Sequence, residues 1–179
     1  MWNLIAEDIL ESLKYLKLSI VIASFLVVLY IVFNKFIKNK PIGIKTIVPM
    51  FILVVYLVSL FQIVFLSREP GSRDGIDLQI FGTITGDARG NSYVIENIFL
   101  FIPLGFLVPL VFNKIRTFWR CIPIGFLLSI CIEVTQLLTK RGFCQLDDVI
   151  MNTLGCMIGF LLWRLMEYNY KRFPLLERD

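Results

Sequence analysis

Five stretches of this chain carry almost no charge and are long enough to cross a lipid bilayer as helices. They lie near residues 18–34, 46–67, 97–113, 121–138 and 149–163. A transmembrane helix needs about 20 mostly apolar residues, so each stretch predicts one span, with the shorter ones ending at polar residues in the interface. Hydrophobic residues make up 57% of the chain and its mean hydropathy is +0.75, far from the values of a soluble domain. The sequence therefore predicts an all-α integral membrane protein, a bundle of about five transmembrane helices.

Residues 1–17 predict an amphipathic N-terminal helix ahead of the transmembrane domain, which we place at 18–179. One face, an arc of about 80°, carries the larger apolar side chains. These are Trp2, Ile5, Ile9, Leu13 and Leu16. Two interpretations stay open. The helix lies in the plane of the membrane interface with Trp2 as an anchor, or it is a lead-in continuous with the first span.

A long, polar, glycine-rich loop separates the second and third spans. Within residues 67–96, the only apolar cluster is Ile76–Ile84, with the sequence IDLQIFGTI. Loops of this length are usually functional or disordered, and the apolar cluster argues against disorder. We expect this cluster to form a short strand or a re-entrant segment that rests on the helices.

Helix-breaking and small residues mark two of the spans. Pro103, Gly105 and Pro109 predict a broken or kinked third span, because a proline inside a helix leaves a carbonyl without its partner. Gly155 and Gly159 are four residues apart on the fifth span, a spacing that lets a neighbouring backbone approach closely. We interpret these positions as helix-packing devices.

The distribution of basic residues predicts the orientation in the membrane. With five spans, residues 34–45, residues 114–120 and the C-terminal tail share one side, and they carry eleven of the 18 Lys and Arg residues. The positive-inside rule places this side in the cytoplasm. We therefore expect a bacterial multi-pass protein with its N-terminus outside, its C-terminus in the cytoplasm and its glycine-rich loop extracytoplasmic.

Polar residues gather where the third, fourth and fifth spans meet the outer face. The set consists of Asn97, Glu133, Gln136, Arg141, Asp147, Asp148 and Asn152. Glu133 lies about 8 Å inside the end of its span at 1.5 Å per residue, and Gln136, three residues on, shares its face. Ionisable residues at such depths are rare and mark functional sites by default.

Two compatible interpretations of this polar cluster stay open. In one, its members only satisfy each other, with Glu133 paired to Arg141 or Lys140, and the cluster fixes the helix register. In the other, the cluster lines an outward cavity for a polar head group. Arg141, helped by Lys140, would then grip a phosphate or carboxylate, and Glu133 would be a proton-sensitive or cation-binding group.

Residue types that are missing from the chain narrow the chemistry. The chain has no histidine, which excludes Ser-His and Cys-His nucleophile pairs and every His-ligated metal site. None of its four cysteines forms a C-x-x-C pair, so no zinc or redox motif is present. We expect no metal and no cofactor. The basic residues flank membrane spans, where they meet lipids, so no nucleic-acid partner is expected.

Four short motifs together resemble the VanZ-like family, small bacterial membrane proteins named for a glycopeptide-resistance accessory factor. The motifs are N-x-x-x-F-x-P-x-G from Asn97, E-x-x-Q from Glu133, R-G at Arg141 and D-D-x-x-x-N-T-x-G from Asp147. The resemblance covers roughly residues 46–165. Two departures stand out. Gln145 takes the place of a usual acidic residue, which argues against a divalent-metal site, and Ile80 takes the place of a common proline.

The resemblance implies an envelope protein that lowers susceptibility to teicoplanin. Our first hypothesis is a non-enzymatic protein that binds a lipid-linked cell-wall precursor or a lipid-tailed glycopeptide at the outer leaflet. One alternative is a membrane enzyme acting on polyprenyl-phosphate-linked substrates, with Glu133, Asp147 and Asp148 in acid–base roles. The other is a small transporter, although five spans without an internal repeat fit that class poorly. Membrane lipids are the remaining expected partners.

Overall fold

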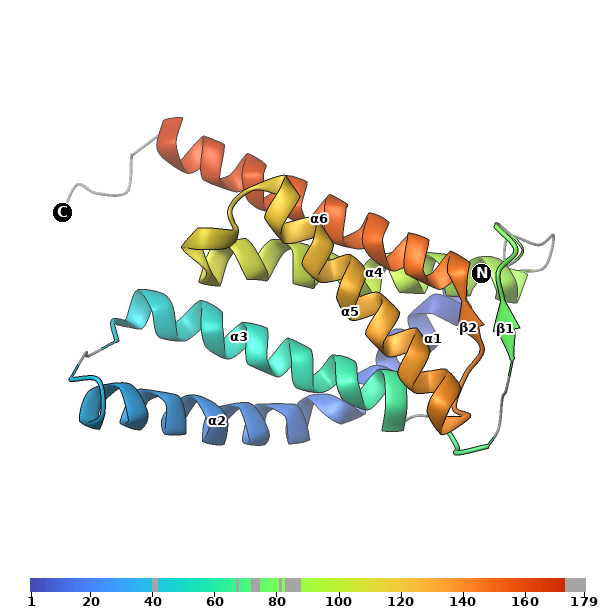
Figure 1. Ribbon diagram of the computed structural model, residues 1–179, viewed down its shortest axis with the longest axis horizontal. Coiled ribbons are helices and arrows are strands. Elements are labelled where there is room, and N and C mark those ends of the chain that lie inside the picture. The colour runs from blue at the N-terminus through green and yellow to red at the C-terminus, as the bar shows by residue number, and fades with distance from the viewer. Residues whose placement is uncertain (40–41, 67, 72–74, 81, 83–87, 173–179) are drawn as a thin grey trace.

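The computed structural model describes residues 1–39, 42–66, 68–71, 75–80, 82 and 88–172 as a bundle of helices (Figure 1). Within this described part, five helical stretches are long and apolar enough to cross a membrane. They are Trp2–Phe36, Ile44–Leu66, Gly90–Val111, Phe118–Thr139 and Leu146–Arg172. The predicted all-α bundle of five spans is confirmed.

The N-terminal amphipathic segment is helical and runs into the first span through a bend. Helix α1 (Trp2–Ser12) passes through a 3-10 turn at Leu13–Tyr15 into α2 (Leu16–Phe36). Figure 1 shows α1 turning away from the line of α2. It packs against α4 and buries Ile5 there, so the segment belongs to the bundle.

Helix α3 (Ile44–Phe61) runs antiparallel to α2 and ends in a π-helix at Gln62–Leu66. A polar bridge joins these helices. Ser59 Oγ and Gln62 Nε2 both donate to Ser19 Oγ, at 2.8 and 2.7 Å. A buried hydroxyl satisfied in this way holds two helices in register where the surroundings are otherwise apolar.

Helix α4 (Ala88–Val111) is longer than the sequence indicated. The loop was expected to extend to residue 96, but residues 88–96 are helical and pack beside α1. The expected break is also absent, because the helix continues through both prolines. Pro109 leaves the Gly105 carbonyl without its helical donor, and Cys121 Sγ of α5 donates to that oxygen at 3.9 Å. A tertiary contact therefore replaces the hydrogen bond that Pro109 removes.

A short turn connects the last two helices and carries the second strand of a small sheet. Helix α5 (Phe118–Thr139) follows a 3-10 turn at Asn113–Ile115, and α6 (Leu146–Arg172) completes the bundle. Strand β1 (Ile76–Asp77) pairs in parallel with β2 (Cys144–Gln145), with Ile76 opposite Cys144. The strand alternative for the apolar cluster thus holds over two residues.

The rest of that apolar cluster does not rest on the helices where it is described. Leu78 and Ile80 are 68% and 62% exposed. Residues 81 and 83–84 of the cluster, and the glycine at 86, lie outside the described residues.

The backbones of α4 and α6 touch along a seam of glycines. A Cβ atom on Gly105 would lie 1.9 Å from the Cys156 carbonyl oxygen. On α6, a Cβ on Gly155 would lie 2.2 Å from the Ile98 oxygen, and one on Gly159 would lie 2.0 Å from the Ile102 oxygen. No side chain fits at these three positions. This glycine seam fixes how α6 lies on α4.

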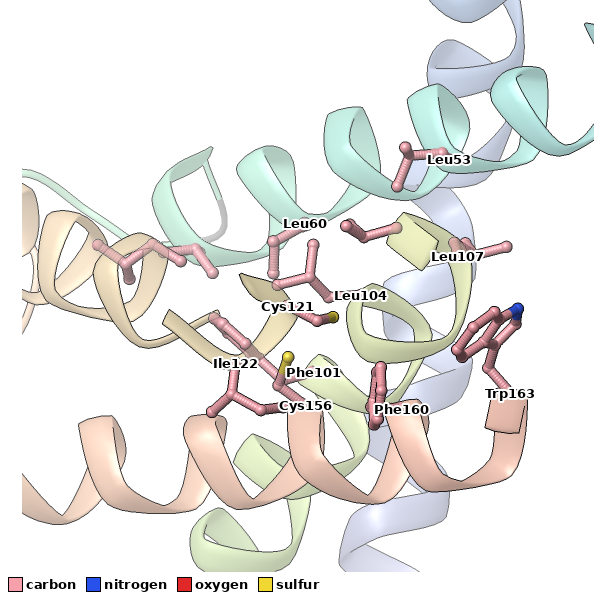
Figure 2. Close-up of a cluster of buried hydrophobic side chains, with 13 residues drawn as sticks. Leu53, Leu60, Phe101, Leu104, Leu107, Cys121, Ile122, Cys156, Phe160 and Trp163 are labelled. Carbon is pink, nitrogen blue, oxygen red and sulfur yellow. The ribbon is translucent and has the colours of Figure 1, made fainter. Parts of the chain in front are cut away.

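The apolar core lies among α3, α4, α5 and α6 (Figure 2). Figure 2 shows the Cys121 and Cys156 sulfurs facing one another between α5 and α6. Trp163 closes the core and is 1% exposed. Arg116 lies over its ring, 5.8 Å from the centroid, and pairs with Glu167 at 3.6 Å.

The two ends of the bundle differ in chemistry. In Figure 1, the N-terminus, β1 and β2 lie at one end, and the C-terminal end of α6 lies at the other. The α2–α3 and α4–α5 connections share the second end. Both connections and the last turn of α6 carry basic residues. The polar cluster belongs to the first end.

A candidate binding cavity at the strand end of the bundle

A cavity of about 920 Å³ opens at the end of the bundle that carries β1 and β2. Its walls come from α1, the end of α3, α4, the end of α5, the α5–α6 turn and the start of α6. Six of the seven predicted cluster residues line it. They are Asn97, Glu133, Gln136, Arg141, Asp148 and Asn152. Asp147 is buried as well but is outside the lining.

Glu133 connects α5 to the small sheet. Its Oε2 accepts a hydrogen bond from the Gln145 backbone N–H at 3.0 Å, and the side chain is 2% exposed. The contact therefore satisfies a carboxylate oxygen and fixes β2 against the helix. Arg141, one of the two partners expected for Glu133, instead uses its Nη1 on the backbone carbonyls of Phe65 and Arg68.

Arg141 clamps the end of α3. Its Nη1 donates to the Phe65 backbone carbonyl and, at 3.2 Å, to the Arg68 carbonyl. The last carbonyls of a helix have no partners within that helix, so a cation placed there satisfies them. Arg141 lines the cavity, yet this nitrogen is committed to the protein backbone.

Arg68 is one of the charged cavity residues that the sequence did not single out, together with Glu69 and Glu96. It interacts electrostatically with both Glu133 and Asp148. Its Nη1 would lie only 2.5 Å from a Cβ atom on Gly142, so the absence of a side chain there makes room for the guanidinium. Its position in the sequence could have indicated this role, because Arg68 directly follows the second span, at the end of the bundle where the acidic residues gather.

The first turns of α6 supply the opposite wall. Asp148 is hydrogen-bonded to the side chain of Asn97 on α4. One turn later, Asn152 Nδ2 donates to Ser129 Oγ of α5 at 2.9 Å. Carboxylates in the first turn of a helix are favoured by the helix dipole, which helps to hold Asp147 and Asp148 at this end.

Two buried amide oxygens in the cavity wall have no hydrogen-bond partner among the described residues. They are Gln136 Oε1 and Asn152 Oδ1, on side chains that are each 2% exposed. An unsatisfied buried polar group costs about 1–3 kcal/mol. Groups of this kind at a cavity surface are places where a ligand or water gains a hydrogen bond.

The comparisons with known proteins match this part of the chain. Residues 50–167 match the VanZ/LLP1 family model. The chain is also 30% identical to Protein VanZ of Enterococcus faecium over 121 residues, 64% of this chain and 72% of that protein. This chain belongs to the VanZ/LLP1 family. No solved structure matches it.

The VanZ/LLP1 match begins inside α3, so α1 and α2 lie outside it, and yet α1 forms one wall of the cavity. Ile5 and Ile9 of α1 face the cavity beside Ile63 and Leu100, which makes this wall largely apolar. Asp8, Glu11 and Ser12 add polar atoms along the same helix. The cavity of this VanZ/LLP1 protein thus joins a polar end to an apolar side.

The acidic and thiol side chains around the VanZ/LLP1 cavity determine which metal and thiol chemistry it could support. Among the described residues, no group of three or more Cys, Asp or Glu side chains is placed to hold a metal ion. Cys144 lies in β2 beside Glu133, and burial together with that carboxylate raises the pKa of the Cys144 thiol. A thiol with a raised pKa stays protonated near neutral pH and is a poor nucleophile.

Proposed function

We propose that this protein binds a lipid-linked or lipid-tailed cell-envelope molecule in the cavity and thereby lowers susceptibility to a lipid-tailed glycopeptide such as teicoplanin. The supporting observation is the cavity itself, which brings six predicted polar residues together beside an apolar wall. Ligand pockets typically enclose about 300–1,000 Å³, so the space suits a head group with part of a tail.

The orientation of the cavity completes this proposal. The basic segments lie at the opposite end of the bundle, and the positive-inside rule assigns that end to the cytoplasm. The cavity would then open at the outer leaflet, with the N-terminus outside. A C-terminal fluorescent reporter should be active and a C-terminal secreted phosphatase inactive. The reverse result would place the cavity on the wrong side for this function.

The main experiment compares teicoplanin susceptibility in a host that expresses wild type, Glu133→Gln or Arg68→Gln. Both variants change charged groups of the cavity, and both should lose the protection given by wild type at equal protein levels. Glu7→Gln is the matched control, because Glu7 is an exposed carboxylate outside the cavity lining. Full protection by both cavity variants would end the proposal.

A labelling experiment tests whether water reaches the cavity. In a background without the four native cysteines, single cysteines at positions 97 and 148 should react with a membrane-impermeant maleimide added outside. A cysteine at 147 should stay unlabelled, because Asp147 is 2% exposed and outside the lining. Equal labelling at 147 and 148 would contradict the cavity.

One observation favours an enzyme as a second candidate. Glu133 and Asp148 interact electrostatically across α5 and α6 within one cavity. Two neighbouring carboxylates can divide general acid and base roles. Turnover of a polyprenyl phosphate by the purified protein, lost in Asp148→Asn, would establish this activity, and no turnover would leave binding as the function.

A further inference from the structure

The two unsatisfied amide oxygens of the cavity are held in fixed orientations. Gln136 uses its Nε2 to reach the Val64 carbonyl at 3.5 Å, and Asn152 uses its Nδ2 on Ser129. Their nitrogens are engaged with other helices, so it is the oxygens that are left over. Both side chains line the cavity and are 98% buried, and their oxygens have no donor among the described residues, so a ligand or water can supply one.

Carboxylates stand beside these acceptors on the same helix faces. Glu133 precedes Gln136 by three residues on α5, and Asp148 precedes Asn152 by four residues on α6. Among the described residues, Arg68 is the cation that interacts with both carboxylates. The whole lining carries six carboxylates against two guanidinium groups, so the cavity has an excess of negative charge. The carboxylates belong to Asp8, Glu11, Glu69, Glu96, Glu133 and Asp148, and the guanidinium groups to Arg68 and Arg141.

This balance disfavours an anionic head group. A phosphate would stand next to Glu133 and Asp148 and would find two amide oxygens where it needs donors. The Arg141 guanidinium, which the sequence suggested for gripping an anion, donates to the carbonyls of Phe65 and Arg68. A bare metal ion is also a poor match, because an ion occupies little of a space of about 920 Å³ with an apolar wall.

We infer that the polar end of the cavity recognises a primary ammonium group carried by the lipid-tailed molecule, with Gln136 Oε1 and Asn152 Oδ1 accepting its N–H bonds. Glu133 and Asp148 supply the opposite charge, and the apolar wall that includes Ile5 and Ile9 takes the tail. The inference rests on the proposed binding function and names the chemical class of its ligand.

The test uses three single-chain amphiphiles with the same tail. Native mass spectrometry of the purified full-length protein would compare dodecylamine, dodecyltrimethylammonium and dodecyl phosphate. The first two share a positive charge, but only dodecylamine can donate hydrogen bonds. Dodecylamine should bind about tenfold more tightly than either of the others, the size expected for charge-assisted hydrogen bonds.

Two variants connect the effect to the named atoms. Asn152→Leu and Gln136→Met remove an acceptor with little change in size, and each should reduce dodecylamine binding several-fold while leaving dodecyltrimethylammonium binding unchanged. The control is Asn34→Leu. Asn34 is a buried asparagine of α2 that donates to the Tyr30 carbonyl of its own helix and lies outside the cavity lining.

Binding of the three amphiphiles to the wild-type protein tests the inference even if a variant fails to fold. Equal binding of all three amphiphiles would overturn the ammonium inference and leave the proposed function standing. Preferred binding of dodecyl phosphate would do the same and would return Arg68 and Arg141 to an anion-binding role. Binding of none of them would overturn both.

Discussion

The two sides of α4 show opposite ways of using a helix surface. Toward α6, Gly105 and the facing Gly155 and Gly159 let the backbones touch, and no space remains. Toward α1, the same helix lines a cavity of about 920 Å³ with Asn97 and Leu100 among its walls. Because the glycine seam fixes α4 against α6, the side of α4 that faces α1 does not need to be closely packed and can line a cavity. Substitutions on the two sides should therefore separate loss of folding from loss of binding.

The largest effect is expected at the seam. Gly155→Ala places a Cβ atom 2.2 Å from the Ile98 carbonyl oxygen, so α6 must move away from α4. We expect the free energy of unfolding to fall by about 3 kcal/mol, the upper part of the range for overpacking. Thermal unfolding in detergent measures it. Gly43→Ala is the control, with open space around its Cβ, and equal stability of both variants would show that the seam is not tight.

The second-largest loss of stability is expected when Arg141, which clamps the end of α3, is replaced. Arg141→Met removes the donor to the Phe65 and Arg68 carbonyls and should cost about 2 kcal/mol, as for hydrogen bonds from a charged group. Arg141→Lys keeps the charge but not the planar, fork-shaped donor group, so it should recover only part of the loss. Wild-type stability of Arg141→Met in the same unfolding assay would mean that the clamp does not stabilise this end.

Glu133 should show a smaller effect on folding. Glu133→Leu leaves the Gln145 N–H without its acceptor and should reduce the free energy of unfolding by about 1 kcal/mol. Glu133→Gln retains an acceptor oxygen and should unfold like wild type, although it loses the charge that the cavity uses. Chemical unfolding of the two variants separates these roles, and a large loss in Glu133→Gln would show that the charge itself stabilises the fold.

The smallest effect on stability is expected on the cavity wall of α1. Ile9→Ala should change the free energy of unfolding by less than about 0.5 kcal/mol, because Ile9 is 50% exposed. It should still lower the affinity for a lipid-tailed ligand, since Ile9 lines the cavity. Leu10→Ala changes the next residue, which is 66% exposed and outside the lining, and should bind like wild type. Equal losses in the two variants would remove α1 from the site.

The sequence predicted the number of spans because uncharged runs mark a bilayer crossing directly. It did not predict where the helices end. Residues 88–96 and Arg164–Arg172 carry charges and were therefore not assigned to the spans. In the structure they are helical, as continuations of α4 and α6 beyond the apolar runs. The continuous path through Pro109 was also missed, because the donor to the freed carbonyl comes from Cys121 on another helix. Such contacts are not visible in a local pattern.

The sequence predicted which residues gather at the site, because they lie at a similar depth in their spans. It did not predict which contacts they make there. Glu133, Gln136, Asp148 and Asn152 were placed together by helix spacing alone. Arg68 was missed because a single arginine that follows a span is first interpreted as a determinant of membrane topology. The α1 wall was missed because residues 2–12 reach the cavity only through the bend at Leu13–Tyr15. The actual partner of Arg141, a backbone carbonyl, carries no sequence signal.

The π-helix that ends α3 carries a consequence for comparing relatives. Its five residues, Gln62–Leu66, turn more widely than an α-helix and accommodate one more residue per turn. A relative with one residue fewer at this point would continue as an ordinary helix, and everything after it would be rotated by about 100° around the axis. In such a relative, the basic side chain that faces the equivalents of Glu133 and Asp148 would have to come from a position next to that of Arg68. An alignment that forces Arg68 into the same column in such proteins would pair residues that occupy different places in space.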